Sequence, residues 1–487
     1  MMSEQPDPRL NLVPENIRHI HIMGICGTGM AAMAGMLQES GYRVTGSDQN
    51  VYPPMSDFLA KAGIAVMQGY VPENLEPRPD LVIVGNVIRA VYPEAQRLAE
   101  LNIPYISMPQ ALGHFFLGGA EAKKSLVVAG THGKTTTSSL LATALYRAGY
   151  SPGFLIGGIV EAFGRNYRIG EGDLFVVEGD EYDTAFFDKV SKFLHYRPHY
   201  AILTSIEFDH ADIFTDLEQI RASFARFVGL IPPDGVLIAC TDDPMVTETA
   251  TLCSGPVISY GTGQDCCWQL RDLTVTGLRS TFSAYKDGTL FGAFSLPMPG
   301  QHNALNALAV IALMEHIGVE QEAIKHGLAS FEGVKRRQQI RGEMNGITVI
   351  DDFAHHPTAV RETVHALRLA WPERRLIIIF EPRTNSSRRA VFQQQYAEAF
   401  AGADRVIVRE IVPLADVPPE QQFSSQKLAD ALNRQGIPAE YFPDTEAILD
   451  RLTELARPGD VIAILSNGGF DNIHELLLDK LEAMYGG

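Results

Sequence analysis

Short runs rich in apolar residues recur along this chain, each followed by a glycine-rich or polar loop and then by a helical pattern. Continuous apolar runs of this length are typical of strands that are buried on both faces, as in parallel sheets. Their alternation with helices predicts doubly wound α/β domains. The clearest runs are residues 20–23, 42–45, 81–84, 127–129, 174–177, 200–203, 236–239, 348–350, 376–379 and 461–464.

The strand–loop–helix rhythm restarts twice, which predicts three α/β domains, about the number expected for 487 residues. The pattern of apolar and polar residues changes between residues 257 and 296. Short alternating segments and a Lys286-Asp287-Gly288 turn predict a small antiparallel meander there. Two helices are expected after it, at residues 303–317 and 320–330. The central domain is therefore expected to have a mixed sheet.

The loop after residues 127–129 carries the strongest chemical signal. Gly130-Thr-His-Gly-Lys-Thr-Thr136 leads into a helical pattern over residues 138–147. Loop amides and the positive end of a helix dipole bind phosphate, so Lys134 would reach the terminal phosphates and the Thr135 hydroxyl would hold Mg²⁺. The usual pattern has a glycine where this chain has Val128, so the loop is a shortened one. The sequence predicts a nucleoside triphosphate site, and we expect that replacing Lys134 leaves the fold intact.

Acidic groups follow the next two strands of the same domain. Glu178 comes directly after residues 174–177, and Asp209-His210 follows residues 200–203. Carboxylates at strand ends beside a phosphate loop can hold Mg²⁺, which prefers oxygen ligands. A solvated acidic loop is the alternative interpretation.

The first loop of the chain, residues 24–29, is similar to a dinucleotide-binding fingerprint, but Cys26 occupies the middle glycine position. Asp48 ends the second strand, where an acid could meet a ribose. Because Cys26 would crowd a pyrophosphate, a mononucleotide or nucleotide-sugar site is favoured over a redox domain.

Composition excludes several other classes. The formal net charge of −18 argues against nucleic acid, which needs a basic surface. The five cysteines lack paired metal spacing, and Cys266-Cys267 is expected to be one buried and one half-exposed thiol, as in a reducing compartment. No signal peptide and no apolar run of ~18 residues is visible, so we expect a cytoplasmic protein without membrane insertion.

Further polar clusters lie in the last third of the chain. An Asn303–Asn306 pair shares one helical face, Asp351-Asp352 and His355-His356 follow one strand, and Arg383 follows the next. Together with the loops above, these motifs resemble the Mur ligases, the ATP-dependent amide-forming enzymes of peptidoglycan synthesis. The resemblance extends over nearly the whole chain after about residue 17. It rests on residues 130–136, 178–181, 209–210, 302–306, 335–337 and 351–357.

The resemblance implies an α/β fold of three domains that uses ATP and Mg²⁺. Residues 1–122 would form a Rossmann-like UDP-sugar-binding domain, and residues 123–332 a P-loop ATPase-like domain with a mixed sheet. Residues 333–487 would form a Rossmann-like domain that binds the acceptor amine. Many members carry a carbamylated lysine where this chain has Ala225, so none is expected here.

Residues 351–357 resemble the branch of the family whose donor is UDP-N-acetylmuramate itself. Its acceptor would be L-alanine or the murein tripeptide L-alanyl-γ-D-glutamyl-meso-diaminopimelate, and residues 48–56, 181–189, 208–214 and 466–470 resemble the tripeptide-using enzymes. We therefore expect amide formation with the tripeptide through an acyl phosphate, in peptidoglycan recycling. The L-alanine ligase is the alternative, and a nucleotide-binding regulator is a third. We expect small-molecule partners only and a monomer or weak homo-oligomer.

The resemblance also implies roles for individual residues. Catalysis is expected to involve Lys134, His210 and His355, and Mg²⁺ to be held by Thr135, Glu178 and His210. ATP would contact Gly130, Thr131, His132, Gly133, Lys134, Thr135, Thr136, His302, Asn303, Asn306, Arg337 and Asp352. The UDP-sugar would contact Gly24, Cys26, Gly27, Thr28, Gly29, Met30, Ser47, Asp48, Gly85 and Asn86. For the acceptor carboxylates we expect Arg383, Asn385, Arg388 and Asn467, since an arginine fork binds carboxylates in a bidentate way.

Overall fold

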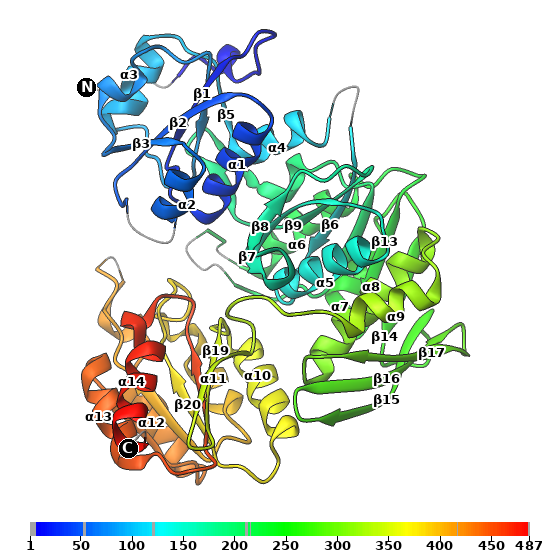
Figure 1. The fold of residues 1–487 in the computed structure, drawn as a ribbon, viewed down its shortest axis with the longest axis vertical. Coiled ribbons are helices and arrows are strands. Elements are labelled where there is room, and N and C mark those ends of the chain that lie inside the picture. The colour runs from blue at the N-terminus through cyan, green and yellow to red at the C-terminus, as the bar shows by residue number, and fades with distance from the viewer. Residues whose placement is uncertain are drawn as a thin grey trace. The chain divides into compact units, whose positions relative to one another are not determined.

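The computed structural model describes residues 6–51, 55–118, 122–209, 213–214, 216–415 and 417–485 (Figure 1). The chain forms two compact units. The first contains residues 1–159, 163–206 and 220–258, and the second contains residues 160–162, 207–219 and 259–487.

The first sheet of the first unit is wholly parallel, with strand order β3-β2-β1-β4-β5. Strand β4 is apolar and wholly buried, as its sequence predicts, and β1 is buried from Ile20 to Met23 although it contains His21. The strands are β1 (His19–Met23), β2 (Arg43–Asp48), β3 (Ala65–Gln68), β4 (Leu81–Val84) and β5 (Tyr105–Ser107). The helices are α1 (Thr28–Glu39), α2 (Met55–Lys61), α3 (Pro93–Glu100) and α4 (Met108–Phe115), with single 3₁₀ turns η1 (Pro8–Leu10) and η2 (Pro72–Leu75).

The second sheet of this unit has β6 at its centre, in the order β13-β12-β6-β9-β7-β8. Strand β6 pairs in parallel with β9, so that Val128 lies opposite Glu178. This register places the phosphate loop after β6 beside the acidic loop after β9. The strands are β6 (Lys124–Ala129), β7 (Gly153–Val160), β8 (Arg165–Arg168), β9 (Leu174–Gly179), β12 (Tyr200–Leu203) and β13 (Val236–Cys240). The helices are α5 (Lys134–Arg147), α6 (Leu217–Val228) and α7 (Pro244–Ala250), with η3 (Glu161–Phe163) and η4 (Lys192–His195).

A two-stranded hairpin, β10 (Asp183–Ala185) and β11 (Asp188–Ser191), follows the acidic loop. Its tip residues Phe186 and Phe187 pack against the apolar cluster of the N-terminal sheet. The ring of Phe187 meets that of Tyr105 edge-on, with centroids 4.7 Å apart. The hairpin thus joins the two sheets of the first unit.

Strand β8 makes a second junction between these sheets, at helix α1. The Tyr167 hydroxyl donates to Glu39 over 2.9 Å, and Asn166 Nδ2 donates to the Thr28 carbonyl over 3.3 Å. Tyr167 fits only because α1 has Gly35 opposite its hydroxyl, where a Cβ would collide with it. Helix α1 is therefore held near both of its ends.

The second unit begins with the predicted meander. Strands β15, β16 and β17 are antiparallel, and the β16–β17 turn has φ of 48° at Asp287 and 77° at Gly288, as a two-residue hairpin turn requires. The prediction is wrong for the first strand, because β14 pairs with β15 in parallel, through Tyr260 and Trp268. The elements are β14 (Val257–Gly261), β15 (Trp268–Thr276), β16 (Arg279–Lys286), β17 (Thr289–Leu296), α8 (Gln301–His316) and α9 (Gln321–Ala329).

The last sheet has the order β18-β19-β23-β20-β21-β22 and is parallel except for β18. Alternate residues of β20 join two different cores: Ile378 packs with helices α10, α11 and α12, and Ile377 with α13 and α14. The sheet is thus covered on both faces. Its elements are β18 (Gln339–Met344), β19 (Ile347–Asp352), β20 (Leu376–Phe380), β21 (Arg405–Arg409), β22 (Ala439–Phe442), β23 (Val461–Leu465), α10 (Pro357–Ala370), α11 (Gln393–Ala399), α12 (Ser425–Arg434), α13 (Thr445–Leu455), α14 (Ile473–Tyr485), η5 (Ala390–Phe392), η6 (Pro419–Gln421) and η7 (Phe470–Asn472).

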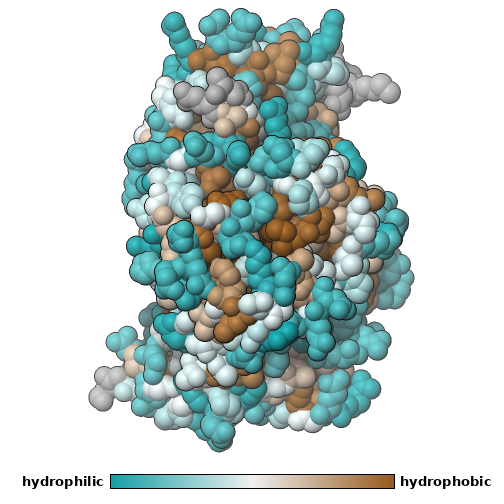
Figure 2. All heavy atoms as spheres, turned by 90° about the vertical axis from the view of Figure 1, so that its right-hand side faces the viewer, coloured by the Kyte–Doolittle hydropathy of each residue, from teal (hydrophilic) through white to brown (hydrophobic). Residues whose placement is uncertain are grey.

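The surface, the lengths of the helices and the cysteines can be compared with what the composition predicts. Figure 2 shows a face on which hydrophilic residues are interspersed with hydrophobic ones. Among the described residues, no helix has the length and apolar character needed to cross a bilayer. Cys266 is buried and Cys267 half-buried, both as free thiols, which confirms the expectation for this pair.

Candidate active site

The loop from Gly130 to Gly133 is pressed against the end of strand β12. Gly130 has φ of 133°, and a Cβ there would lie 2.9 Å from the Ser205 backbone nitrogen. The Thr131 amide donates to the Ser205 carbonyl over 2.9 Å, and the His132 amide donates to the Ser205 hydroxyl over 3.1 Å. Gly133, with φ of 80°, then turns the chain into α5. The loop is therefore rigid and delivers a helix N-terminus to the edge of the sheet, where an anion would be stabilised.

Lys134 is the first residue of α5, and its ammonium group is buried among acceptors. It donates to the Gly130 carbonyl over 2.7 Å and to Glu181 Oε2 over 2.8 Å, and it lies 4.0 Å from Asp180. Burial alone would lower the pKa of Lys134, but the carboxylates of Glu181 and Asp180 outweigh it and hold the pKa above its ordinary value. Lys134 is therefore a fixed positive charge beside the loop.

Glu178, at the end of β9, faces the second residue of α5. It accepts a hydrogen bond from the Thr135 hydroxyl over 2.8 Å and one from the Gly157 amide over 2.6 Å. Burial and the neighbouring Asp180 raise the pKa of Glu178. A cluster of carboxylates whose negative charge disfavours ionisation fits a divalent cation, which takes carboxylate and hydroxyl oxygens. Gly157 has no signal in the sequence that marks this role, yet a Cβ there would meet the Glu178 carboxylate.

The expected third ligand, His210, lies outside the described residues. Thr135 and Glu178 are the expected ligands that the structure brings together directly.

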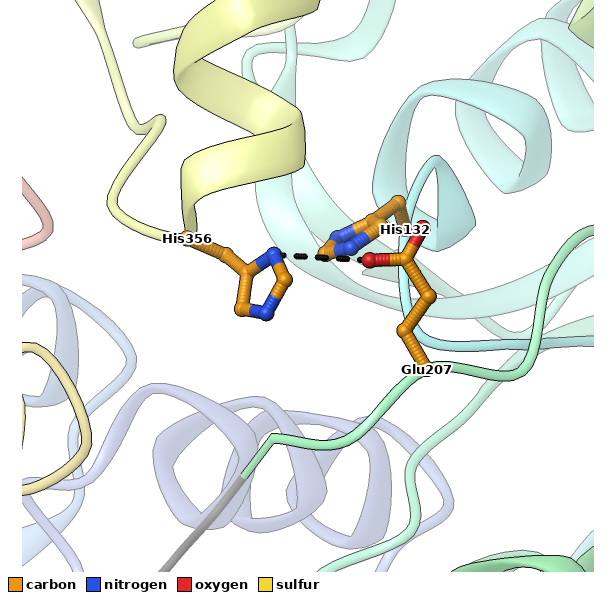
Figure 3. Close-up of side chains that lie close together, drawn as sticks. All are labelled: His132, Glu207 and His356. Atoms are coloured by element: carbon orange, nitrogen blue, oxygen red, sulfur yellow. Dashed lines mark ion pairs between the residues drawn. The ribbon is translucent and has the colours of Figure 1, made fainter. Parts of the chain in front are cut away.

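In the second unit, Glu207 and His356 lie next to each other, a contact that the sequence did not single out (Figure 3). His356 Nδ1 lies 3.7 Å from Glu207 Oε2, which also accepts from the Thr358 hydroxyl over 2.7 Å. His356 is buried and caps α10. The expected catalytic residue, His355, is half-buried instead, and its Nδ1 lies 3.0 Å from the Phe353 carbonyl oxygen. Adjacent histidines thus have different surroundings, which a sequence cannot distinguish.

The residues expected to meet the nucleoside of ATP lie around the start of α8 and the end of β19. Asn303 is buried and donates to the Pro299 carbonyl over 2.8 Å and to Gln338 over 3.2 Å. The Asp352 carboxylate accepts from the backbone amides of Gln338 and Ala354, each over 2.8 Å. Asn303 and Asp352 therefore hold the backbone and side chains around the expected nucleoside site in place.

His302, expected at the adenine, and Arg337, expected at the phosphates, are both half-buried. Burial lowers the pKa of His302 to about 4, so its ring is neutral at pH 7 and can accept or donate a hydrogen bond. The Arg337 guanidinium lies 4.5 Å from the centroid of the Phe353 ring. Asn306 is buried on the same face of α8 as Asn303.

The loop expected to bind the UDP-sugar is tied to the end of β2. The amides of Gly24 and Ile25 donate to the Ser47 carbonyl over 2.8 and 3.1 Å, and the Cys26 amide donates to Asp48 Oδ2 over 2.9 Å. Burial and the nearby Asp48 raise the pKa of Cys26 to about 11. The side chain of Met30 fills the space between Gly27 and Gly85.

Asp48 therefore orients the loop, because one carboxylate oxygen holds the Cys26 amide and the other accepts from the Asn50 amide over 2.9 Å. Helix α1 starts at Thr28 without a side-chain cap. Its first turn is the place where a diphosphate would find amide donors. Gly29 belongs to this turn, and Asn86 is exposed beyond β4.

The expected acceptor residues follow β20 and β23, whose carboxyl ends are neighbours. Arg383 is exposed, and its guanidinium lies against Gly468, where a Cβ would collide with it. Arg388 donates to the Val412 carbonyl over 3.0 Å and to Asn385 over 3.2 Å, so it links its own loop to the segment that follows β21. Asn467 is half-buried beside Gly468.

A shortened phosphate loop with a fixed lysine and buried carboxylates beside it, in a chain built from parallel α/β sheets, is typical of a nucleotide-dependent enzyme. Three family models match the chain: "Mur ligase family, catalytic domain" over residues 19–118, "Mur ligase middle domain" over 128–314, and "Mur ligase, glutamate ligase domain" over 336–468.

Individual proteins agree with these matches. The chain is 41% identical to the UDP-N-acetylmuramate–L-alanyl-γ-D-glutamyl-meso-2,6-diaminoheptandioate ligase of Escherichia coli, covering 95% of this chain and 98% of that protein. It is 35% identical to the UDP-N-acetylmuramate–L-alanine ligase of Geobacter sulfurreducens, covering 96% and 98%. The crystal structure of a murein peptide ligase from Psychrobacter arcticus superposes with a TM-score of 0.70 at 35% identity, covering 95% and 98%.

The chain therefore belongs to the Mur ligase family. It is an ATP- and Mg²⁺-dependent ligase that forms an amide bond. The three-domain α/β fold expected from the sequence is confirmed. The role of each site residue stays a prediction.

Proposed function

We propose that this ligase joins the lactyl carboxylate of UDP-N-acetylmuramate to the amine of L-alanyl-γ-D-glutamyl-meso-diaminopimelate through an acyl phosphate, in peptidoglycan recycling. The observation that carries the proposal is the 41% identity to an enzyme named for this tripeptide, against 35% for an alanine ligase, over nearly the same length. An exposed arginine beside the loop after β23 supports an acceptor that carries carboxylates.

The first step must bring a carboxylate to a triphosphate of like charge. Lys134 supplies a fixed ammonium group beside the phosphate loop, held by Glu181 and the Gly130 carbonyl. Thr135 and Glu178, with His210, would hold Mg²⁺, which supplies further positive charge when bound. Because hydrogen bonds hold Lys134, Thr135 and Glu178 in place before the substrates arrive, little reorganisation opposes the transfer.

The second step needs a neutral amine close to the activated carbonyl. The unperturbed pKa of an α-amine, about 7.7–8.0, is already near working pH, so the base needs only modest strength. The candidates for this role are His355, whose half-buried ring lies beyond β19, and a nearby aspartate. Arg383, Asn385, Arg388 and Asn467 would bind the acceptor.

We also propose the domain boundaries, the cellular location, the oligomeric state and the partners that the sequence predicts. The UDP-sugar domain would be residues 1–122, the ATP domain 123–332 and the acceptor domain 333–487. ATP and a UDP-linked donor are cytoplasmic metabolites, and the described cysteines are free thiols, which supports a cytoplasmic enzyme. We propose a monomer or weak homo-oligomer that binds small molecules and no nucleic acid.

Phosphate release tests the proposal directly. The protein is incubated with ATP, Mg²⁺ and UDP-N-acetylmuramate, and either the tripeptide or L-alanine is added. We expect release with the tripeptide and little with L-alanine. Release with L-alanine alone would assign the chain to the alanine ligases, and release with neither acceptor would contradict both substrates.

A further inference from the structure

The loop that follows β23 contains an unusual backbone conformation. Phe470, Asp471 and Asn472 have φ of 44°, 48° and 58°, so three successive non-glycine residues lie in the left-handed region. L-residues visit this region singly, because Cβ crowds the carbonyl oxygen. The preceding Gly468-Gly469 would have adopted it without strain. The surrounding structure must therefore hold the turn at residues 470–472.

Arg409, the last residue of β21, makes the contacts that hold this turn. One guanidinium nitrogen donates to Glu381 Oε1 over 2.7 Å, and the other lies 2.9 Å from Asp471 Oδ2. The guanidinium carbon lies 5.4 Å from the centroid of the Phe470 ring. Thr445, at the start of α13, donates to the same Asp471 oxygen over 2.7 Å. A single side chain thus joins the end of β20 to the left-handed turn.

The same network continues into the first half of the loop. The second oxygen of Glu381 accepts from the Ser466 hydroxyl over 2.5 Å, and that hydroxyl accepts from the Gly468 amide over 2.9 Å. From the β19 side, Arg336 Nη2 donates to the carbonyls of Ser466 and Gly468, each over 2.6 Å. Two arginines therefore fix the backbone of residues 466–472 from two directions.

The fixed loop presents two groups that suit a ligand. Among the described residues, Asn467 Oδ1 is buried and has no hydrogen-bond partner, so it can accept from an N–H group. The Arg383 guanidinium packs on Gly468 and can bind a carboxylate. A peptide acceptor carries both kinds of group. The carboxyl ends of β19, β20, β21 and β23 meet here, where open α/β sheets bind ligands.

We propose that Arg409 is a positioning residue for the acceptor: through Glu381 and Asp471 it holds residues 470–472 in their left-handed turn and so fixes Asn467 beside Arg383. The inference rests on the proposed function for the identity of the acceptor. It requires the arginine fork, because a lysine ammonium is a point charge that cannot span two carboxylates in the same geometry.

Steady-state kinetics of Arg409→Lys and Arg409→Met test the proposal. We expect the KM for the acceptor to rise about tenfold or more in both variants, since a small misplacement of binding groups has large effects. The KM values for ATP and UDP-N-acetylmuramate should stay within about twofold of wild type. A purely structural defect would instead lower the active fraction and leave all three KM values unchanged.

The same strand offers a matched control. Arg405 begins β21 and pairs with Glu440 over 2.7 Å, with 23% of its side chain exposed against 19% for Arg409. It lies at the amino end of the strand, away from the loop. Arg405→Met should therefore leave the acceptor KM unchanged.

A second variant keeps the test decisive if Arg409→Met does not fold. Asp471→Gly removes the partner of Arg409 without adding strain, so it should fold. Glycine also adopts many backbone conformations, so the turn is no longer held in one of them and the acceptor KM should still rise. An unchanged acceptor KM in folded Arg409→Lys and Asp471→Gly would overturn the proposal. If the wild-type protein uses L-alanine and not the tripeptide, the proposed function fails, and the same variants measured with L-alanine still decide the role of Arg409.

Discussion

Replacing Lys134 by alanine tests the phosphate loop, and the structure changes what this variant should do. The sequence led us to expect an intact fold. The ammonium group, however, pairs with Glu181 over 2.8 Å, and only 10% and 2% of the two side chains are exposed. Lys134→Ala leaves the Glu181 carboxylate buried without its main counter-charge. The variant should therefore lose stability as well as activity.

Both losses can be estimated. Breaking a buried ion pair by removing one partner typically costs about 3–5 kcal/mol, because the remaining charge is uncompensated. Removing one preorganised charge that stabilises a transition state costs on the order of 10²–10³ in kcat. An inactive Lys134→Ala protein alone would thus be ambiguous, since unfolding explains it equally well.

The double variant Lys134→Ala/Glu181→Gln separates the two effects. It removes the charge of both partners, so the free energy of unfolding, measured by urea denaturation, should recover most of the loss. Phosphate release should stay at the level of the single variant, because the charge at the phosphate loop is still absent. Lys192→Ala is a useful control, since Lys192 pairs with the more exposed Asp180 over 3.0 Å and should matter less to stability.

Recovery of activity together with stability in the double variant would refute the reasoning. It would mean that Lys134 is needed only to neutralise Glu181. Near-normal activity in a folded Lys134→Ala protein would remove the phosphate-loop assignment altogether.

Three further predictions concern other parts of the molecule. Glu178→Gln should raise the Mg²⁺ concentration needed for half-maximal activity, and an unchanged Mg²⁺ titration would show that Glu178 is not a ligand. The pKa of His302 is lowered to about 4, so the unfolded chain takes up this proton first as pH falls from about 6.5 to about 4. The free energy of unfolding should therefore fall in that window, by at most about 1.4 kcal/mol per pH unit, and His302→Asn should flatten the profile measured by urea denaturation. In Gly35→Ala the new methyl group should collide with Tyr167 and lower the free energy of unfolding by about 1–3 kcal/mol. The KM for UDP-N-acetylmuramate should rise more than the KM for the acceptor. If both KM values rise by the same factor or stay at wild type, the α1–β8 junction does not act on binding of the UDP-sugar.

The strands and helices were predictable where burial is uniform. Residues 81–84 and 200–203 are the bounds of β4 and β12, because a strand covered on both faces must be apolar throughout. The turn at Asp287-Gly288 was predictable because its backbone requires residues that tolerate positive φ. The parallel pairing of β14 was not, since local alternation does not specify the direction of a partner strand.

The candidate site was predictable only as far as its motifs are local. The sequence could predict that Glu178 and Thr135 lie close together, because the carboxyl ends of adjacent parallel strands lie at the same edge of a sheet. Arg336 and Arg409 act through residues more than fifty positions away, as in the contacts of Arg336 with Ser466 and of Arg409 with Asp471. Neither contact leaves a pattern in the neighbouring sequence. His355 and His356 differ only in what the fold places around them.

The hairpin of β10 and β11 has a consequence for dividing this protein into parts. Phe186 and Phe187 belong by sequence to the ATP-binding region, yet they cover apolar side chains of the N-terminal sheet, including the ring of Tyr105. A fragment that ends at residue 122 would lack these two rings, so the apolar cluster of the N-terminal sheet that they cover would be exposed to water. Grafting the N-terminal sheet onto another ligase would require that the hairpin tip be transferred with it, because the surface that makes the sheet a stable module is supplied by a different part of the chain.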